Sequence, residues 1–225
     1  MNDFSVHTMQ VCLHGRYLIR QASTNSPAPL LVGFHGYGEC AEDELDRLSS
    51  IPGSSAWCLC VPEALHHFYN TQGAPGSCWM TSRDRDLRIA ENIRYIDAVF
   101  DELFTICHSE GTVVLHGFSQ GTGMACRTAV LGRYAVSGVM LLGGDIPPEL
   151  QDIEKMGSVH LARGSRDPFF AETRFQRDVD RLCRAGVPCR QLTFAGNHWA
   201  NNEYFFAAGE FLDSLRSAKD RKSVV

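Results

Sequence analysis

Ser119 is the residue of this chain whose setting best fits a nucleophile. It lies in the segment HGFSQG (residues 116–121), after an apolar run at 112–115 and before a stretch of small residues. A serine hydroxyl attacks a carbonyl only when a base accepts its proton and donors stabilise the resulting oxyanion. A strand-to-helix turn exposes the hydroxyl, and Gly117 and Gly121 relieve the clashes in such a turn. We therefore favour a nucleophile on a sharp turn over a serine in an ordinary glycine-rich loop.

A histidine that follows Ser119 is the expected base. In open-sheet serine hydrolases the nucleophile, the acid and the histidine come in that order along the chain. His160 lies inside the apolar segment 158–162, as a core histidine would, whereas His198 comes just after a predicted strand. Open α/β sheets place their sites at the carboxyl ends of strands. We predict that His198 is the base, the alternative being a histidine of a surface loop.

Two aspartates are candidates for the acid that orients the base and stabilises its charged form. Asp167 follows a predicted strand and precedes Pro168, and Asp145 follows the preceding strand. Asp167 is one strand nearer to the histidine loop, so the sequence favours it. Asp145 remains the rival, and a turn or a helix cap is the ordinary role for either residue.

Backbone amides are the expected donors to the oxyanion. One amide usually comes from the residue after the nucleophile, here Gln120, and another from the loop after an early strand. The segment FHGYG (residues 34–38) ends an apolar run and contains glycines that let a backbone N–H turn inward. Tyr37 is the second predicted donor, and a tight turn that needs glycine for geometry alone is the alternative.

These residues require a scaffold in which the ends of strands meet. Strands and helices alternate along most of the chain, which predicts an α/β fold with a mostly parallel, twisted sheet and helices on both faces. Residues 4–22 are expected to form an antiparallel hairpin around His14 and Gly15 at one edge. Apolar residues at helical spacing predict a long helix from Asp86. The other predicted elements are strands at 30–34, 56–61, 112–115, 138–142, 158–162 and 190–194 and helices at 42–50, from the Ser119 turn to 132, around 175–182 and at 202–215.

The length and charge of the chain limit the classes to which it could belong. A chain of 225 residues can bury one α/β core, so we predict one domain over 1–217, without a separate lid, and a charged tail at 218–225. The net charge of -5 and the scattered lysines and arginines form no basic stripe, so nucleic acid is not an expected partner. Polar residues interrupt the N-terminal segment, which predicts neither a signal peptide nor a membrane span and hence a cytoplasmic protein.

The nine cysteines are expected to be free thiols. Cys58, Cys60, Cys107 and Cys126 fall in predicted strands or helices, where free cysteine behaves as a small apolar residue. An odd number in such positions does not fit a disulfide scaffold. Cys58 and Cys60 have no matching Cys/His pair nearby, so core packing is favoured over zinc. No metal or organic cofactor is expected.

Several segments of the chain resemble the phospholipase/carboxylesterase family of α/β-hydrolases, which includes bacterial carboxylesterases and acyl-protein thioesterases. The resemblance covers residues 30–212 and rests on FHGYGE, SCWM, LHGFSQGTGMA, ARGSRDP and FAGNHW. It implies a lidless α/β-hydrolase, and it strengthens the preference for Asp167 over Asp145. The site that it implies has a triad of Ser119, Asp167 and His198 and an oxyanion hole made by the amides of Tyr37 and Gln120.

The chain departs from the pattern of this family at three positions near the predicted site. Glu39 stands where the family commonly has aspartate, Thr81 where aspartate often follows the Trp-aromatic pair, and Asn197 where glycine usually precedes the histidine. None of these changes removes a member of the triad. Thr81 and Asn197 indicate a pocket with altered contacts.

The segment 62–85 is long and has no sustained period, so we expect it to form one wall of a substrate pocket. Its aromatic residues have an alternative role, which is to hold the segment against the core. The charges at 83–88 alternate in sign, which is typical of a solvated helix start. A site for the head group of an anionic ester is the alternative there. The predicted pocket residues are Trp79, Met80, Phe68 and Trp199.

These features together predict a serine hydrolase that cleaves carboxylic esters of short to medium acyl chain through an acyl-enzyme. Thioesters and lysophospholipids are alternative substrates. The expected partner is a small-molecule ester, with no stable membrane insertion, and a homodimer is compatible with the sequence but not required by it. A non-catalytic ligand-binding protein on the same fold is the alternative from another class.

Overall fold

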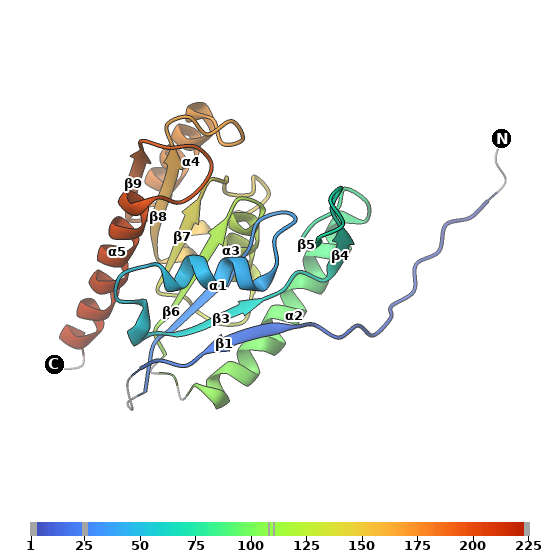
Figure 1. Cartoon of the computed structure of the whole chain (residues 1–225), viewed down its shortest axis with the longest axis horizontal. Coiled ribbons are helices and arrows are strands. Elements are labelled where there is room, and N and C mark those ends of the chain that lie inside the picture. The colour runs from blue at the N-terminus through green and yellow to red at the C-terminus, as the bar shows by residue number, and fades with distance from the viewer. Residues whose placement is uncertain (1–3, 24–26, 108, 110, 223–225) are drawn as a thin grey trace.

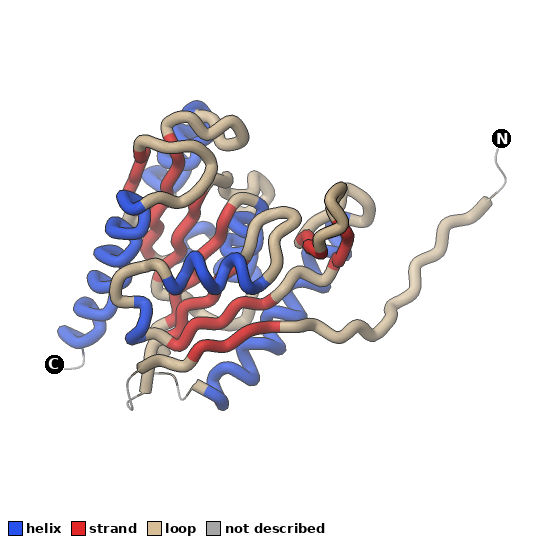
Figure 2. The backbone as a smooth tube through the Cα atoms, in the orientation of Figure 1, coloured by secondary structure: helices blue, strands red, loops and turns tan. Residues whose placement is uncertain are grey.

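The computed structural model describes residues 4–23, 27–107, 109 and 111–222, and a seven-stranded sheet lies at its centre. The strand order is β1-β3-β2-β6-β7-β8-β9 (Figures 1 and 2). β1 runs antiparallel to β3, and the other neighbours are parallel, as expected. The strands are β1 (Tyr17–Arg20), β2 (Leu30–Phe34), β3 (Cys58–Pro62), β6 (Val113–Phe118), β7 (Gly138–Leu142), β8 (Ser158–Gly164) and β9 (Cys189–Phe194).

Helices cover both faces of this sheet, because side chains alternate between its faces along each strand. In β2, Leu30, Val32 and Phe34 pack into a core with α2, α3 and α4. Leu31 packs into a second core on the opposite face, with α1 and α5. The helices are α1 (Ala41–Ser49), α2 (Arg85–Ile106), α3 (Gln120–Leu131), α4 (Glu172–Arg184) and α5 (Asn202–Lys222), with short 3-10 turns at Ser54–Ala56 and Ile153–Met156.

The prediction of an N-terminal hairpin at residues 4–22 is wrong. Only β1 (Tyr17–Arg20) forms, and it supplies the antiparallel edge of the sheet, while residues 4–16 contain no strand. This segment extends away from the domain in Figure 1. Its apolar side chains, such as Val6 and Met9, are exposed. They have no core face to cover, and pairing without burial gives a strand little stability.

The segment 62–85 is more regular than its sequence indicates. β4 (His66–Tyr69) and β5 (Pro75–Cys78) form an antiparallel hairpin beside the main sheet. Two backbone hydrogen bonds fasten this hairpin to the loop after β2: Gly38 N donates to Ser77 O at 2.9 Å and Ser77 N donates to Glu39 O at 3.1 Å. Gly76 permits the contact, since a Cβ atom there would lie 2.3 Å from the Gly38 carbonyl oxygen. The hairpin thereby supports the loop that contains Tyr37.

Two further expectations differ from the structure. Cys58 of β3 and Cys107, which follows α2, form a disulfide instead of remaining free. They lie 49 residues apart, and no motif in the sequence signals their pairing. The last helix, α5, continues through 218–222 of the expected tail, and 223–225 lie outside the described residues.

Two features are absent from the described part of the chain. Within it, no group of three or more His, Cys, Asp or Glu side chains is arranged to hold a metal ion. No helix in the same residues is long and apolar enough to cross a membrane.

Candidate active site

Ser119 occupies the turn between β6 and α3, in a strained backbone conformation with φ 52° and ψ -115°. Non-glycine residues rarely adopt a positive φ, so the surrounding structure must hold this turn. Ser119 N donates to Leu142 O at 2.8 Å, and the Thr122 side chain and amide both donate to Ser119 O. The chain passes so closely at Gly117 that a Cβ atom there would lie 2.5 Å from the Gly121 carbonyl oxygen. The glycine spacing therefore has a steric cause.

His198 lies between Ser119 and Asp167 and contacts both. Its Nε2 atom is 2.9 Å from Ser119 Oγ, and its Nδ1 atom is 2.8 Å from Asp167 Oδ2. Asp167 follows β8 and His198 follows β9, so the carboxyl ends of neighbouring parallel strands bring the acid and the histidine together. With the carboxylate on Nδ1, the imidazole carries its proton there and presents the Nε2 lone pair to the serine hydroxyl.

The carboxyl group of Asp167 is fixed by its own backbone. Its Oδ1 atom accepts hydrogen bonds from the amides of Phe169 at 2.8 Å and Phe170 at 3.0 Å, which leaves Oδ2 for the histidine. The rival, Asp145, forms an ion pair with Arg177 at 3.1 Å instead. The geometry thus gives Asp167, and not Asp145, the contact with His198.

Two aromatic rings pack against His198. The ring centroids of Phe118 and Phe169 each lie 4.9 Å from that of His198. Trp199 packs on Phe118 at 5.3 Å and is 60% exposed. Phe118 and Phe169 were not among the predicted site residues, although both stand within two residues of a predicted triad member. Their closeness in sequence to Ser119 and Asp167 is the signal that could have identified them.

The amides of Gln120 and Tyr37 have no hydrogen-bond acceptor within the described residues. Gln120 is the first residue of α3, where a helix leaves its N–H groups unpaired. The loop containing Tyr37 is held by Glu39, whose Oε2 accepts a hydrogen bond from Gly36 N at 2.7 Å. The Gln120 side chain contacts the segment 62–85, where its Oε1 atom accepts a hydrogen bond from Trp79 N at 2.8 Å. Both predicted donors therefore lie in segments that other contacts fix.

A buried polar network continues from Glu39 to the strand that precedes Ser119. Arg47 pairs with Glu39 at 2.7 Å and also with Glu44. Glu44 hydrogen-bonds His116 Nδ1 at 2.5 Å, and His116 Nε2 lies 2.7 Å from the Tyr204 hydroxyl. The network joins α1, β6 and α5, so it couples the Tyr37 loop to the strand that precedes the serine.

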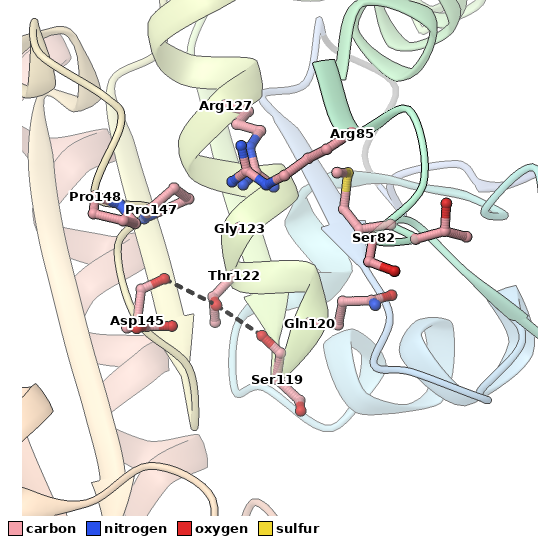
Figure 3. A pocket seen from close by; sticks show the side chains of 12 residues that line it. Ser82, Arg85, Ser119, Gln120, Thr122, Gly123, Arg127, Asp145, Pro147 and Pro148 are labelled. Carbon is pink, nitrogen blue, oxygen red and sulfur yellow. Dashed lines mark hydrogen bonds between the residues drawn. The ribbon is translucent and has the colours of Figure 1, made fainter. Parts of the chain in front are cut away.

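A cavity of about 500 Å³ opens beside Ser119 (Figure 3). Of the four predicted pocket residues, Met80 lines this cavity. Trp79 is fully buried in the core, where its indole N–H donates to His35 O at 3.0 Å. Phe68 packs on Tyr37, with ring centroids 5.1 Å apart. The residues lining the cavity are Met80, Thr81, Ser82, Arg85, Ser119, Gln120, Thr122, Gly123, Arg127, Asp145, Pro147 and Pro148.

Comparison with known families identifies the chain. The model of a family described as Phospholipase/Carboxylesterase matches residues 19–213, which is most of the sequence. The chain belongs to the phospholipase/carboxylesterase family. Members of this family are hydrolases, and the seven-stranded sheet is their α/β-hydrolase fold. A search of the curated proteins found no match.

Solved structures similar to this family member include three esterases or thioesterases. Esterase PE8 is 22% identical, with 90% of this chain and 100% of that chain covered and a TM-score of 0.69. The carboxylesterase of Bacillus cereus is 16% identical, with 89% and 94% covered and a TM-score of 0.70. Acyl-protein thioesterase 2 of Zea mays is 17% identical, with 90% and 99% covered and a TM-score of 0.65. At these identities the similarity establishes the fold.

Two of the three departures from the phospholipase/carboxylesterase pattern place a side chain at the candidate site. Glu39 reaches both the Gly36 amide and Arg47, as described above. Thr81 lines the cavity. The Asn197 carbonyl oxygen approaches the end of β8 so closely that a Cβ atom at Gly164 would lie 1.9 Å from it. Glu39 therefore helps to hold its loop and Thr81 forms part of the cavity surface, whereas the contact at Asn197 is made by the backbone and does not depend on the side chain.

Proposed function

We propose that this protein is a serine esterase that cleaves carboxylic esters through an acyl-enzyme. Ser119 would be the nucleophile, His198 the base and Asp167 the orienting acid. The observation that carries the proposal is the position of His198, within 2.9 Å of Ser119 Oγ and 2.8 Å of Asp167 Oδ2. A nucleophile, a base and a third group that orients the base are the parts that acyl transfer requires.

Acylation begins when Ser119 Oγ attacks the carbonyl carbon of the ester and His198 Nε2 accepts the hydroxyl proton. The carbonyl oxygen becomes an oxyanion, which the amides of Tyr37 and Gln120 stabilise. The Asp167 carboxylate stabilises the imidazolium through Nδ1. When the intermediate collapses, the bond to the alcohol oxygen breaks, and His198 gives its proton to the leaving alcohol.

Deacylation repeats these steps with water. His198 accepts a proton from the water as its oxygen attacks the acyl carbon, and the same amides stabilise the second oxyanion. Collapse of this intermediate breaks the bond to Ser119 Oγ, which takes the proton back from His198. The products are the carboxylic acid and the free enzyme, so the proton balance closes without a cofactor.

The proposed substrates are small-molecule esters with short to medium acyl chains. The cavity of about 500 Å³ next to Ser119 falls within the usual range for small-ligand sites. Thioesters fit the same chemistry, because a thiolate is an easier leaving group than an alkoxide, and one similar structure is that of an acyl-protein thioesterase. Lysophospholipids are a further class, in keeping with the name of the family.

Covalent labelling tests the proposed function and separates it from the ligand-binding alternative. A fluorophosphonate probe should add one phosphonyl group to the wild-type protein, seen as an increase in intact mass. Ser119→Ala should show no increase, whereas Ser82→Ala, which changes another serine of the cavity, should be labelled like the wild type. A folded wild-type protein that stays unlabelled would overturn the proposal and favour a binding protein.

A further inference from the structure

Two arginines converge at the end of the cavity opposite Ser119. Arg85 stands at the start of α2 and Arg127 near the end of α3. Figure 3 shows their guanidinium groups side by side above Gly123, with Ser119 at the other end of the cavity. Their different origins in the sequence mean that the fold, and not a local charge run, brings them together.

One carboxylate oxygen holds both arginines. Glu149 Oε1 accepts hydrogen bonds from Arg127 Nε at 3.0 Å, Arg127 Nη2 at 2.7 Å and Arg85 Nη2 at 2.8 Å. Partial burial acts to raise the pKa of Glu149, but the hydrogen bonds from Arg127 and Arg85 outweigh it and lower the pKa. Two cations thus face one anion. The Nη1 atom of each arginine has no acceptor among the residues that the structure describes.

The other charged group of the cavity is already paired. Asp145 lines the cavity, and its carboxylate contacts Arg177 at 3.1 Å. Arg177 also contacts the buried carboxylate of Asp178 at 3.2 Å. The remaining lining residues are uncharged. The positive charge of the cavity is therefore concentrated at Arg85 and Arg127.

The position of Arg127 sets how far a bound anion lies from the reacting serine. The Nη1 atom of Arg127 lies 3.0 Å from the place that a Cβ atom on Gly123 would occupy. The Arg127 side chain therefore folds back along α3 towards Ser119. Gly123 follows Ser119 by four residues, which is about 6 Å along the helix axis. An anion held by Nη1 would thus lie roughly one helical turn from Ser119.

The cavity lies on the acyl side of the proposed reaction. A leaving alcohol must be close to His198, which donates its proton and packs against Phe118 and Phe169. None of these three residues lines the cavity, whereas Ser119 and Gln120 do. The part of the ester that fills the cavity is therefore the acyl chain.

We infer that the cavity selects acyl chains that end in a carboxylate, bound by Arg85 and Arg127. The arginine pair already binds a carboxylate, that of Glu149, and a planar guanidinium matches this group well. The substrate class is then the half-ester of a dicarboxylic acid, with a few methylene groups between the two carbonyl carbons. This inference rests on the proposed esterase function and adds its substrate class.

Matched ester pairs test the inference. The probes are nitrophenyl half-esters of glutaric, adipic and pimelic acid, each compared with the nitrophenyl ester of pentanoic, hexanoic or heptanoic acid. We expect kcat/KM of the wild type to be at least about tenfold higher for the charged member of the best pair. Raising the salt concentration should reduce the preference, because Arg85 is partly exposed.

Three variants distinguish recognition from a structural role. Arg127→Gln and the more exposed Arg85→Gln should each bring the ratio of charged to neutral kcat/KM towards one. Glu149→Gln, which removes the competing carboxylate, should raise the ratio several-fold. Arg88→Gln is the control on the same helix, since Arg88 pairs with Glu91 and does not line the cavity; its ratio should equal that of the wild type.

The outcomes separate this inference from the proposed function. Neutral esters cleaved as fast as their charged partners, with ratios unchanged in Arg85→Gln and Glu149→Gln, would overturn the inference and leave the esterase intact. No cleavage of any ester by the folded wild type would overturn the proposed function itself. A charged preference that survives in both arginine variants would also contradict the inference.

Discussion

A Cβ atom on Gly121 would lie 1.9 Å from the carbonyl oxygen of Phe34. The start of α3 therefore packs directly against the end of β2, where the loop containing Tyr37 begins. This contact sets the two predicted oxyanion donors, Gln120 and Tyr37, on facing segments of backbone. Gly121 thus permits the turn at Ser119 and also fixes its distance from the neighbouring loop.

Gly121→Ala should destabilise the protein by about 3 kcal/mol or more, because the backbone of Phe34 and His35 leaves no room for the methyl group. Gly123→Ala is the matched change in the same helix. There the nearest atom is the flexible end of Arg127, at 3.0 Å, so we expect a change in stability within about 1 kcal/mol. Urea unfolding of the two variants measures the difference. Equal stability of both variants would show that the approach to Phe34 is not restrictive.

Asp167→Asn should lower kcat for a nitrophenyl ester about 10⁴-fold. The amide still accepts the hydrogen bonds of Phe169 and Phe170 at Oδ1, but its NH₂ group faces His198 Nδ1 and favours the wrong tautomer. Asp145→Asn, in contrast, should stay within about tenfold of the wild type, because Asp145 contacts Arg177 and not His198. The reverse order of the two kcat values would make Asp145 the acid.

His160 should make the folded protein less stable in mild acid. Burial, together with the nearby charges of His116 and Arg190, lowers the pKa of His160 to about 4. Its Nδ1 atom has no hydrogen-bond partner within the described residues. As the pH falls, the unfolded state binds a proton near pH 6.5 and the folded state only near pH 4. Stability from this group is therefore fully present above pH 6.5 and is lost between these two values.

Replacing His160 by leucine should remove this part of the pH dependence. Between pH 7 and pH 5 the free energy of unfolding of the wild type should fall by about 2 kcal/mol more than that of His160→Leu. Denaturant unfolding at both pH values gives the comparison, and groups shared by the two proteins cancel in it. Parallel pH profiles would mean that His160 titrates alike in both states.

The sequence predicted the central sheet because most of its strands are buried apolar runs that end at glycine or polar residues. β2, β6 and β7 are buried along their whole length, and their alternation with helices predicted the parallel order that the structure confirms. Segments without such burial were harder to predict. Residues 4–16 have a strand-like sequence but no partner, and β4–β5 pairs through backbone contacts that leave little periodic signal.

The candidate site was predictable in which residues it brings together and less so in its surroundings. Spacing and position at strand ends selected Ser119, Asp167 and His198, which the structure brings within hydrogen-bond distance. Trp79 illustrates the limit, because hydrophobicity does not distinguish an aromatic that lines a pocket from one that supports it. Arg127 is a residue that the sequence could not place at the site, since its convergence with Arg85 depends on how α2 and α3 pack.

The most direct test of the account is turnover of nitrophenyl esters from acetate to laurate by the wild type and by Ser119→Ala. We predict that the wild type cleaves a band of acyl lengths and that kcat of the variant falls about 10⁴-fold or more, with the fold unchanged by circular dichroism. Turnover by a folded Ser119→Ala protein at a rate near that of the wild type would contradict it, because another group would then carry the reaction.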